Sequence, residues 1–340
     1  MSDCSCALPY PIPNVIITPP MSSWPELSPC TTSGQVTLVF QSEEVNLVVS
    51  KRDVDGNDLG LENSNWVSQA VDMKSARGTA LKLEDNGFEI VLEEEGQENI
   101  DFFNNDEIIS KYYKRCESLV RAVIGENDKA PVVKAFDHNL RCKEMHEANR
   151  KIEHGGIIQK PVTFVHGDYT KTSAPRRLEK LAEAPKVNDS LRQILGDTPL
   201  LSSEEMERAM KGRYMFVNVW RSIDRENPVL HSPLACCDAK TTTMESLLTF
   251  EIHYADRIGE NYFAKYRPCQ SWYYYPQMTH KEALLIKQWD SHGALANGAE
   301  MDAREGMPAT FALHTAFFDP NSEPDSPSRQ SIEVRLVVIW

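Results

Sequence analysis

One stretch of the chain carries the apolar pattern of a helix. Between residues 106 and 124, apolar side chains recur every three or four positions, as one face of a helix requires: Ile108, Ile109, Tyr112, Cys116, Leu119, Val120 and Val123. Asn104 or Asn105 can cap the first turn, and Gly125 can end the last one. The pattern predicts an amphipathic helix whose apolar stripe packs against a sheet.

Strand patterns dominate the rest of the chain. Alternation at residues 36–50 predicts two strands, and the apolar run at 87–92 predicts another. From Pro161 onward, further strands are predicted at residues 162–166, 214–220, 262–266, 284–288, 312–318 and 331–340. Turn-rich segments separate these short strands, which favours a sandwich or a barrel. Two more polar helices are expected at residues 177–195 and 203–211.

The order of these elements predicts one mainly β domain with flanking helices. A chain of 340 residues can form one large domain or two small ones. The sequence shows no internal repeat and no clear linker, so we expect a single domain over residues 36–340, with a helical insertion at 177–211. Residues 1–35 are rich in Pro, Ser and Cys, and they predict an extended arm on the surface of the domain.

Composition narrows the class of protein. The net charge of −14 and the lack of a basic patch argue against a nucleic-acid partner. No apolar run approaches the roughly 20 residues of a membrane-spanning helix, and the N-terminus has no basic start and no apolar core. We therefore expect a cytoplasmic protein without a membrane partner, whose eight cysteines are reduced. The sequence does not decide whether the protein forms a homo-oligomer.

One short motif has the spacing of two metal ligands. His166-Gly-Asp168 follows an apolar run, and at the end of a strand the two side chains can reach the same metal ion. A chain with nine histidines can contain such a pair by chance, so a turn with a capping Asp is the competing interpretation. A third ligand must come from a distant strand. His314, in an apolar run, is the candidate, although a core histidine is the alternative.

The last predicted strand offers groups that could bind a dicarboxylate. 2-Oxoglutarate has a distal carboxylate that is well matched by an arginine and a hydroxyl group, and Arg329 and Ser331 provide both. Arg335 lies on the same face of the strand, because alternate residues share a face. An internal ion pair with Glu333 is the other interpretation of Arg335. The sequence does not decide which arginine binds 2-oxoglutarate and which, if either, binds a substrate carboxylate.

Several longer segments resemble a family of mostly fungal iron(II)- and 2-oxoglutarate-dependent oxygenases, of the gibberellin-desaturase-like and aspergillic-acid-hydroxylase-like kind. The family includes a bacterial component of cephamycin methoxylation and amino-acid cyclases that form aziridines. The matching segments cover most of the chain from residue 76 onward: Tyr112-Tyr113 with Glu117-Ser-Leu-Val120 and Gly125, Phe136-Asp-His-Asn-Leu-Arg141, Val165-His-Gly-Asp-Tyr-Thr170, Asn218-Val-Trp-Arg221, Pro233-Leu-Ala-Cys-Cys-Asp238, Tyr266-Arg-Pro-Cys-Gln-Ser-Trp-Tyr273, Lys287-Gln-Trp-Asp-Ser291, His314-Thr-Ala-Phe317 and Arg329-Gln-Ser-Ile-Glu-Val-Arg335.

The resemblance implies a double-stranded β-helix, or jelly-roll, with iron(II) held by His166, Asp168 and His314. It also implies the use of 2-oxoglutarate and O2, with release of succinate and CO2. Further candidates for contact with the substrate or cosubstrate come from the matching segments: Asn218, Arg221, Trp272 and Tyr273. Two positions depart from the family pattern, since Leu313 stands where Pro is common and an acidic residue near His231 is missing.

The implied function is oxidation of an unactivated C–H bond in secondary metabolism. The substrate would be a small molecule that carries a carboxylate or derives from an amino acid, and the outcome hydroxylation, desaturation or cyclisation. Two alternatives remain at this point. One is a metal-dependent jelly-roll enzyme that does not use 2-oxoglutarate. The other is a non-catalytic partner of another tailoring enzyme, although such a protein has no need of three metal ligands.

Overall fold

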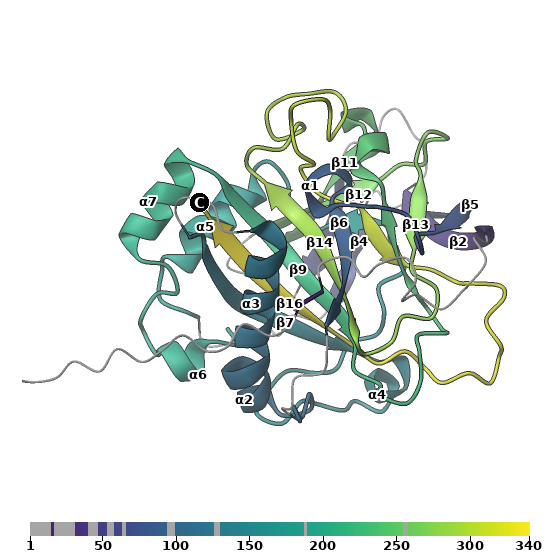
Figure 1. The fold of residues 1–340 in the computed structure, drawn as a ribbon, viewed down its shortest axis with the longest axis horizontal. Helices are drawn as coiled ribbons and strands as arrows, with labels where there is room; N and C mark the ends of the chain where they lie inside the picture. Colours follow the sequence, from purple (N-terminus) through teal and green to yellow (C-terminus); the bar gives the residue numbers. More distant parts are fainter. Residues whose placement is uncertain are drawn as a thin grey trace, which may run out of the picture.

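The computed structural model of the chain describes residues 15–16, 31–39, 47–52, 58–62, 66–93, 99–125, 130–186, 189–253 and 258–340. Most of the arm predicted at residues 1–35 lies outside these ranges. Within it, Val15–Ile16 (β1) and the start of Thr31–Val39 (β2) are strands that pair with the domain. Two sheets form the body of the protein, and helices flank them (Figure 1).

The first sheet has six antiparallel strands in the order β1-β6-β14-β9-β16-β7. Every residue of β9 and β14 is buried, because the sheet is covered on both faces. Register places Arg335 opposite both Asn218 and Asp137, so these three residues lie in one row across the sheet. Its strands besides β1 are β6 (Phe88–Glu93), β7 (Val132–Arg141), β9 (Tyr214–Ser222), β14 (Glu282–Asp290) and β16 (Ser331–Ile339).

The second sheet has ten strands in the order β2-β5-β13-β10-β15-β8-β12-β11-β3-β4. Its centre brings together short strands from distant parts of the sequence: His314 pairs with His166 on one side and with Cys236 on the other. Its strands besides β2 are β3 (Leu47–Arg52), β4 (Asp58–Glu62), β5 (Trp66–Ser75), β8 (His166–Gly167), β10 (Leu234–Cys237), β11 (Leu247–His253), β12 (Ile258–Ala264), β13 (Trp272–Tyr274) and β15 (His314–Ala316).

The long amphipathic helix is confirmed. It consists of α2 (Asn105–Glu107), the π-helical turn η2 (Ile108–Tyr112) and α3 (Tyr113–Ile124). The side chain of Asn104 accepts from the N–H groups of Asp106 and Glu107, and Gly125 at the C-cap has φ of 74°. The helix packs on the outer face of the six-stranded sheet, where the hydroxyl of Tyr113 lies 2.8 Å from Nδ1 of His138 (Figure 1). The opposite, inner face turns toward the second sheet.

The segment between β8 and β9 holds three helices: α5 (Ser173–Leu181), α6 (Arg192–Leu195) and α7 (Ser203–Lys211). The predicted helix at 203–211 is confirmed, and Ser202 and Glu205 form a capping box at its start. The continuous helix predicted at 177–195 is wrong. It divides into α5 and α6 because Pro185 lies between them, and proline cannot continue a helix. Shorter helices are α1 (Leu83–Asn86), α4 (Lys143–Glu147), η3 (Ala239–Thr241) and η4 (Met244–Ser246).

Two predicted strands are shorter in the structure than in the prediction. The strand expected at 162–166 is only β8, and the strand expected at 312–318 is only β15. Backbone groups next to β15 bond elsewhere: the N–H of Ala312 donates to the carbonyl of Lys287, and that of Phe317 to the carbonyl of Pro233. Among the described residues, no helix is long and apolar enough to span a membrane.

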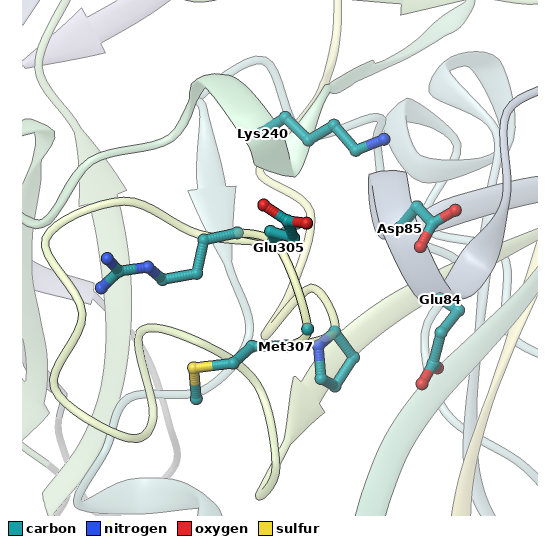
Figure 2. Close-up of a pocket in the computed structure, with 9 residues that line it drawn as sticks. Glu84, Asp85, Lys240, Glu305 and Met307 are labelled. Atoms are coloured by element: carbon teal, nitrogen blue, oxygen red, sulfur yellow. The ribbon is translucent and has the colours of Figure 1, made fainter.

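A polar pocket of about 460 Å³ opens at one side of the fold (Figure 2). Its lining combines acidic and basic groups with a loop: Glu84, Asp85, Lys240, Ala303, Arg304, Glu305, Gly306, Met307 and Pro308. None of the candidate site residues lines it.

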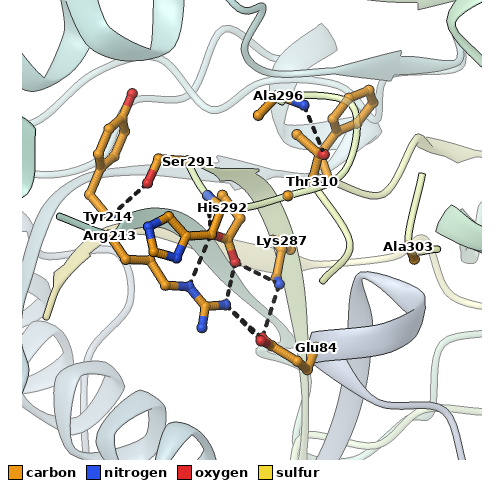
Figure 3. Close-up of polar contacts among 12 residues, drawn as sticks. Glu84, Arg213, Tyr214, Lys287, Ser291, His292, Ala296, Ala303 and Thr310 are labelled. Carbon is orange, nitrogen blue, oxygen red and sulfur yellow. Dashed lines mark hydrogen bonds and ion pairs between the residues drawn. The ribbon is translucent and has the colours of Figure 1, made fainter. Parts of the chain in front are cut away.

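Glu84 also belongs to a charged cluster that joins α1 and β14 to Arg213, the residue before β9 (Figure 3). Lys287 is fully buried, and its ammonium group lies 2.9 Å from Oδ2 of Asp290 and 3.3 Å from Oε2 of Glu84. Arg213 bonds both carboxylates as well. Burial raises the pKa of Asp290, but the charges of Lys287 and Arg213 outweigh it and hold this pKa below its usual range. The cluster therefore fixes one end of β14 against its neighbours.

We predict that Lys287→Met lowers the free energy of unfolding by about 3–5 kcal/mol, because it leaves a buried carboxylate short of one partner. Denaturant unfolding measures the change. The matched control is Lys211→Met, which removes an exposed lysine that pairs with Glu207 on the same helix, and the unfolding midpoint should stay nearly unchanged. Equal effects of the two substitutions would contradict a structural role of the cluster.

Candidate metal centre

His166, Asp168 and His314 lie together in the structure. One ligand atom from each residue falls within a group whose members are all within 4.8 Å of one another. His166 and His314 are paired across β8 and β15, and their ring centroids are 4.4 Å apart. Asp168 follows β8 directly, and its Oδ1 lies 3.7 Å from Nε2 of His166. The sequence spacing and the sheet register thus bring the three predicted ligands to one point.

Gly167 allows the close approach of β8 to the residues beneath it. A Cβ atom at this position would lie 3.1 Å from Cδ2 of Phe311, which is tighter than an ordinary carbon contact. Phe311 is fully buried and stacks with Tyr262 and Trp289. A side chain at residue 167 would therefore push His166 and Asp168 away from the aromatic floor.

Backbone carbonyls fix the orientation of both imidazoles. Nδ1 of His166 lies 2.8 Å from the carbonyl oxygen of Phe164, and Nδ1 of His314 lies 3.1 Å from that of Ala312. A carbonyl only accepts, so each ring carries its proton on Nδ1 and presents the lone pair of Nε2. Burial, together with the nearby His314, lowers the pKa of His166 to about 3. The His166 ring is therefore neutral near pH 7, as metal binding requires.

Asp168 has one oxygen held and one oxygen free. Its Oδ2 accepts from Nδ2 of Asn218 at 3.1 Å and lies 3.4 Å from Nε of Arg335. Its N–H donates to Oε1 of Gln288 at 3.3 Å. Burial raises the pKa of Asp168, but the charge of Arg335 outweighs it and keeps this pKa well below its usual range. An ionised Oδ1 thus remains on the side of the two histidines.

These three residues form a donor set that suits a divalent metal ion. One imidazole nitrogen from each histidine and one carboxylate oxygen lie within 4.8 Å of one another, and this is the ligand set of non-haem iron(II) oxygenases. Such a set leaves the other coordination positions of the metal to small molecules. The residues present therefore fit an iron(II) ion.

Arg335 contacts three protein carboxylates, one through each of its nitrogens. Besides Asp168, it contacts Oδ2 of Asp137 at 3.0 Å and Oε1 of Glu333 at 3.1 Å. The pair with Glu333 was one of the two interpretations of Arg335 from the sequence. Burial lowers the pKa of Arg335, but the three carboxylates outweigh it and raise this pKa above its usual range. This arginine therefore has its donors directed at the protein.

Arg329 and Ser331 retain free polar atoms. Arg329 is only 5% exposed, its guanidinium lies 5.5 Å from the centre of the Trp220 ring, and its Nη1 donates to the carbonyl of Ser232. Nε of Arg329 and Oγ of Ser331 are buried without a hydrogen-bond partner among the described residues. Burial and the charge of Arg141 lower the pKa of Arg329 to about 9. Arg329 and Ser331, two residues apart, thus each keep a buried polar atom that bonds no described residue.

The structure does not bring Arg221 to the metal centre. Asn218 and Arg221 are three residues apart on β9, so they face opposite sides of the sheet. Arg221 pairs with the buried carboxylate of Glu93 and lies over the ring of Tyr112 on the outer face. The expectation of a role for Arg221 at the site is corrected to an ion pair between sheet and helix.

The two aromatic candidates also divide between the faces. Tyr273 is paired with Cys236, which is paired with His314, so all three share the inner face. The ring of Tyr273 lies 6.4 Å from that of Phe88 on the first sheet. Trp272 is its immediate neighbour on the strand and therefore faces the other way, into the buried core. Tyr273, and not Trp272, therefore lies on the face of the sheet that carries His314, two strands away from it.

Three residues around the centre were not singled out from the sequence. Gln288, Asp137 and Arg141 all lie in segments that carry the family resemblance, but their chemistry there depends on sheet register. The amide nitrogen of Gln288 is buried without a partner in the described part of the chain. The alternation of β7 could have placed Asp137 and Arg141 on one face, if residues 132–141 had been recognised as a strand.

Most of the chain resembles proteins that are already known. Residues 41–339 match the family model described as "YDMC: Oxidoreductase/YMDC permease-like domain". A Methylophilus leisingeri protein, "Uncharacterized protein in dcmA 3'region", is 32% identical over 202 residues, which cover 57% of this chain and 92% of that protein. The "Fe(II)/2-oxoglutarate-dependent dioxygenase nvfI" of Aspergillus novofumigatus is 26% identical over 283 residues, 81% of this chain and 85% of that protein.

A solved structure resembles the fold closely. The "iron and alpha-ketoglutarate-dependent endoperoxidase NvfI" superimposes with a TM-score of 0.66 and 22% identity, over 92% of this chain and 98% of that chain. The double-stranded β-helix that the sequence predicts is thereby confirmed.

We predict that Asn218→Ala weakens the binding of a divalent transition metal by about 10–100-fold, because Asp168 loses a donor that orients it. Competition with a chromophoric chelator measures the affinity. Gln69→Ala is the control, since this exposed amide donates only to the neighbouring backbone carbonyl of Ala70, and it should bind metal like the wild type. Wild-type affinity in a folded Asn218→Ala protein would contradict the orienting role.

Proposed function

We propose that this chain, which belongs to the oxidoreductase/YMDC permease-like family and is an Fe(II)- and 2-oxoglutarate-dependent dioxygenase, holds its iron with His166, Asp168 and His314. The observation that carries the proposal is the set of free ligand atoms at one point. Both Nδ1 atoms are directed at backbone carbonyls, and Oδ2 of Asp168 is held by Asn218, so Nε2, Nε2 and Oδ1 are left to face the metal.

Iron(II) and 2-oxoglutarate supply the oxidising chemistry, in which O2 converts the cosubstrate to succinate and CO2 and an unactivated C–H bond of the substrate is oxidised. The protein supplies position and electrostatics. The carbonyls of Phe164 and Ala312 orient the two imidazoles, and Asn218 keeps Oδ2 of Asp168 away from the metal. Asp168 would then hold the metal through Oδ1, with the other coordination positions left to the cosubstrate and O2.

Arg329 and Ser331 are proposed to bind the distal carboxylate of 2-oxoglutarate. Their unpartnered Nε and Oγ atoms are buried, and a buried donor without an acceptor destabilises the protein unless a ligand provides one. A guanidinium and a hydroxyl group match a carboxylate. Arg335, the other arginine considered for this role, is proposed to position Asp168 instead, because its donors reach three protein carboxylates.

The substrate is proposed to be a small molecule of secondary metabolism, carboxylate-bearing or derived from an amino acid. The relatives compared include a dioxygenase and an endoperoxidase by name, which supports oxidation without fixing its outcome. Hydroxylation, desaturation and cyclisation all stay within the proposal. In this proposal Arg335 does not bind a substrate carboxylate, because it already contacts three protein carboxylates. The net charge of −14 supports the absence of a nucleic-acid partner, and a cytoplasmic location completes the proposal.

Two other functions would use the same fold. A jelly-roll enzyme without 2-oxoglutarate would not need the unpartnered pair Arg329 and Ser331. A non-catalytic partner protein would not need three ligand atoms within 4.8 Å of one another. Both observations favour the oxygenase.

Anaerobic titration of the apoprotein with iron(II) and 2-oxoglutarate tests the proposal. We expect a weak visible charge-transfer band in the wild type and no band in Asp168→Ala or His314→Ala, because each variant lacks one ligand. Turnover of 2-oxoglutarate to succinate in air should follow the same pattern. A folded wild type that binds iron without developing the band would favour an enzyme that does not use 2-oxoglutarate. Failure to bind iron would favour the partner protein.

Substitutions of Arg329 and of Arg335 should weaken the binding of different ligands. We predict that Arg329→Gln raises the dissociation constant of 2-oxoglutarate by about 10-fold or more, with iron affinity nearly unchanged. Arg335→Gln should instead weaken iron binding, since Asp168 loses its charged neighbour. The same anaerobic titration measures both constants. The reverse pattern would assign the cosubstrate to Arg335.

A further inference from the structure

Three arginines and three carboxylates surround the metal centre, and their pairing is uneven. Arg335 contacts all three carboxylates, which belong to Asp137, Asp168 and Glu333. In the part of the chain that the structure describes, Arg141 and Arg329 form no ion pair. Each donates to a backbone carbonyl only: Nη1 of Arg141 to Lys160 at 3.1 Å, and Nη1 of Arg329 to Ser232.

Sheet register brings these two arginines to the same place. Arg141 on β7 stands directly opposite Ser331 on β16, and such cross-strand neighbours share a face with Cβ atoms about 5 Å apart. Asp137 and Arg335 form another register pair of the same two strands, and they contact each other on the inner face, where Arg335 also reaches Asp168. Arg141 and Ser331 therefore lie on the inner face as well. No bulge separates the two pairs.

Arg329 reaches this place from the start of β16. It precedes Ser331 by two residues, and the ladder continues between them, since the carbonyl of Gln330 accepts from the N–H of Ile223 at 3.0 Å. Residues two apart in an extended chain share a face. Arg329, Ser331 and Arg141 therefore converge, the first two from β16 and the third from β7.

Two guanidinium groups that lie near each other without an anion are unfavourable, and here Arg329 is buried while Arg141 is half-buried. The charge of Arg141 adds to burial in lowering the pKa of Arg329, so the two charges repel each other. Glu333 is the protein carboxylate on the same strand, but its Oε1 is already bonded to Arg335. An anionic ligand between the two arginines reduces their repulsion and provides a counter-ion for the buried charge of Arg329.

We propose that Arg141 is a second guanidinium on the distal carboxylate of 2-oxoglutarate, so that two arginines and Ser331 hold one carboxylate from adjacent strands. The inference rests on the proposed function and deepens it. Each arginine can donate to a separate carboxylate oxygen, and Ser331 can donate to either. The anion also screens the two arginines from each other, which explains why neither forms an ion pair with a carboxylate among the described residues.

This assignment has a consequence for the substrate. With Arg141 and Arg329 on the cosubstrate and Arg335 on protein carboxylates, none of the three arginines around the centre is left for a substrate carboxylate. The substrate proposal then shifts toward molecules whose reacting end is uncharged, such as amino-acid derivatives without a free carboxylate at that end.

A ligand that lacks the distal carboxylate provides a sharp test. The dissociation constants of 2-oxoglutarate and of 2-oxopentanoate, which replaces the distal carboxylate by a methyl group, are measured on the anaerobic iron(II) protein through the charge-transfer band. We expect Arg141→Gln to raise the constant of 2-oxoglutarate by about 10-fold or more and to leave that of 2-oxopentanoate within about 3-fold. Arg141→Lys should fall between Arg141→Gln and the wild type.

Two controls make the result specific. Iron(II) affinity without cosubstrate should be unchanged in Arg141→Gln, which shows that the centre is intact. Arg267→Gln removes another arginine that donates to a single backbone carbonyl, that of Glu245, and should bind both oxoacids like the wild type.

Three results would overturn the inference. In the first, Arg141→Gln binds 2-oxoglutarate as the wild type does, which overturns this inference alone and leaves Arg141 for the substrate. In the second, Arg141→Gln weakens both oxoacids equally, which indicates a general structural role. In the third, the wild type shows no band at all, which overturns the proposed function together with the inference.

Discussion

The centre depends on the two oxygens of the Asp168 carboxylate, because one is bonded to the protein and the other is left for the metal. The side chain of Asp168 is 11% exposed, its pKa lies well below the usual range, and its two oxygens have different partners. Asn218 and Arg335 hold Oδ2, whereas Oδ1 turns toward His166. If both oxygens were free, the carboxylate could bind a metal through both and occupy a position needed by a small ligand. The amide and the guanidinium, which come from β9 and β16, therefore set the geometry that the three ligands present.

The fold makes this arrangement possible by joining distant segments at short strands. His166 and His314 face each other because β8 and β15 pair, and each strand is only two or three residues long. Long strands of the six-stranded sheet supply the groups on the opposite side, through the row Asp137, Arg335 and Asn218. Charges that would be unfavourable one by one become stable because Arg335 links three carboxylates in a single network.

The sequence predicted the local and the repetitive features. The helix over α2 to α3 was evident because its stripe of apolar residues is local, and Tyr214–Ser222 and Ser331–Ile339 were found as apolar runs. The strand Val132–Arg141 was missed because its inner face is polar, so apolar alternation is weak. Arg221 could have been excluded from the site, since a residue three positions from Asn218 on a strand faces the other way.

In the candidate site, too, the sequence predicted the features that residue type and order carry, and it did not predict those that depend on sheet register. The His-x-Asp pair and the distant histidine were recognisable, because their chemistry is carried by residue type and order. The roles of Arg329 and Arg335 were not, because the two share a face of one strand and differ only in their partners. Asp137, which occupies one end of Arg335, is nearly 200 positions away in the sequence and becomes its neighbour only through sheet register.

A crystal structure of the anaerobic protein with iron(II) and 2-oxoglutarate tests the division of Asp168 most directly. We expect iron bound by Nε2 of His166, Nε2 of His314 and Oδ1 of Asp168 alone, with Oδ2 still bonded to Asn218 and Arg335. Iron bound through both oxygens of Asp168, or bound elsewhere with these three residues unchanged, would contradict the proposed centre.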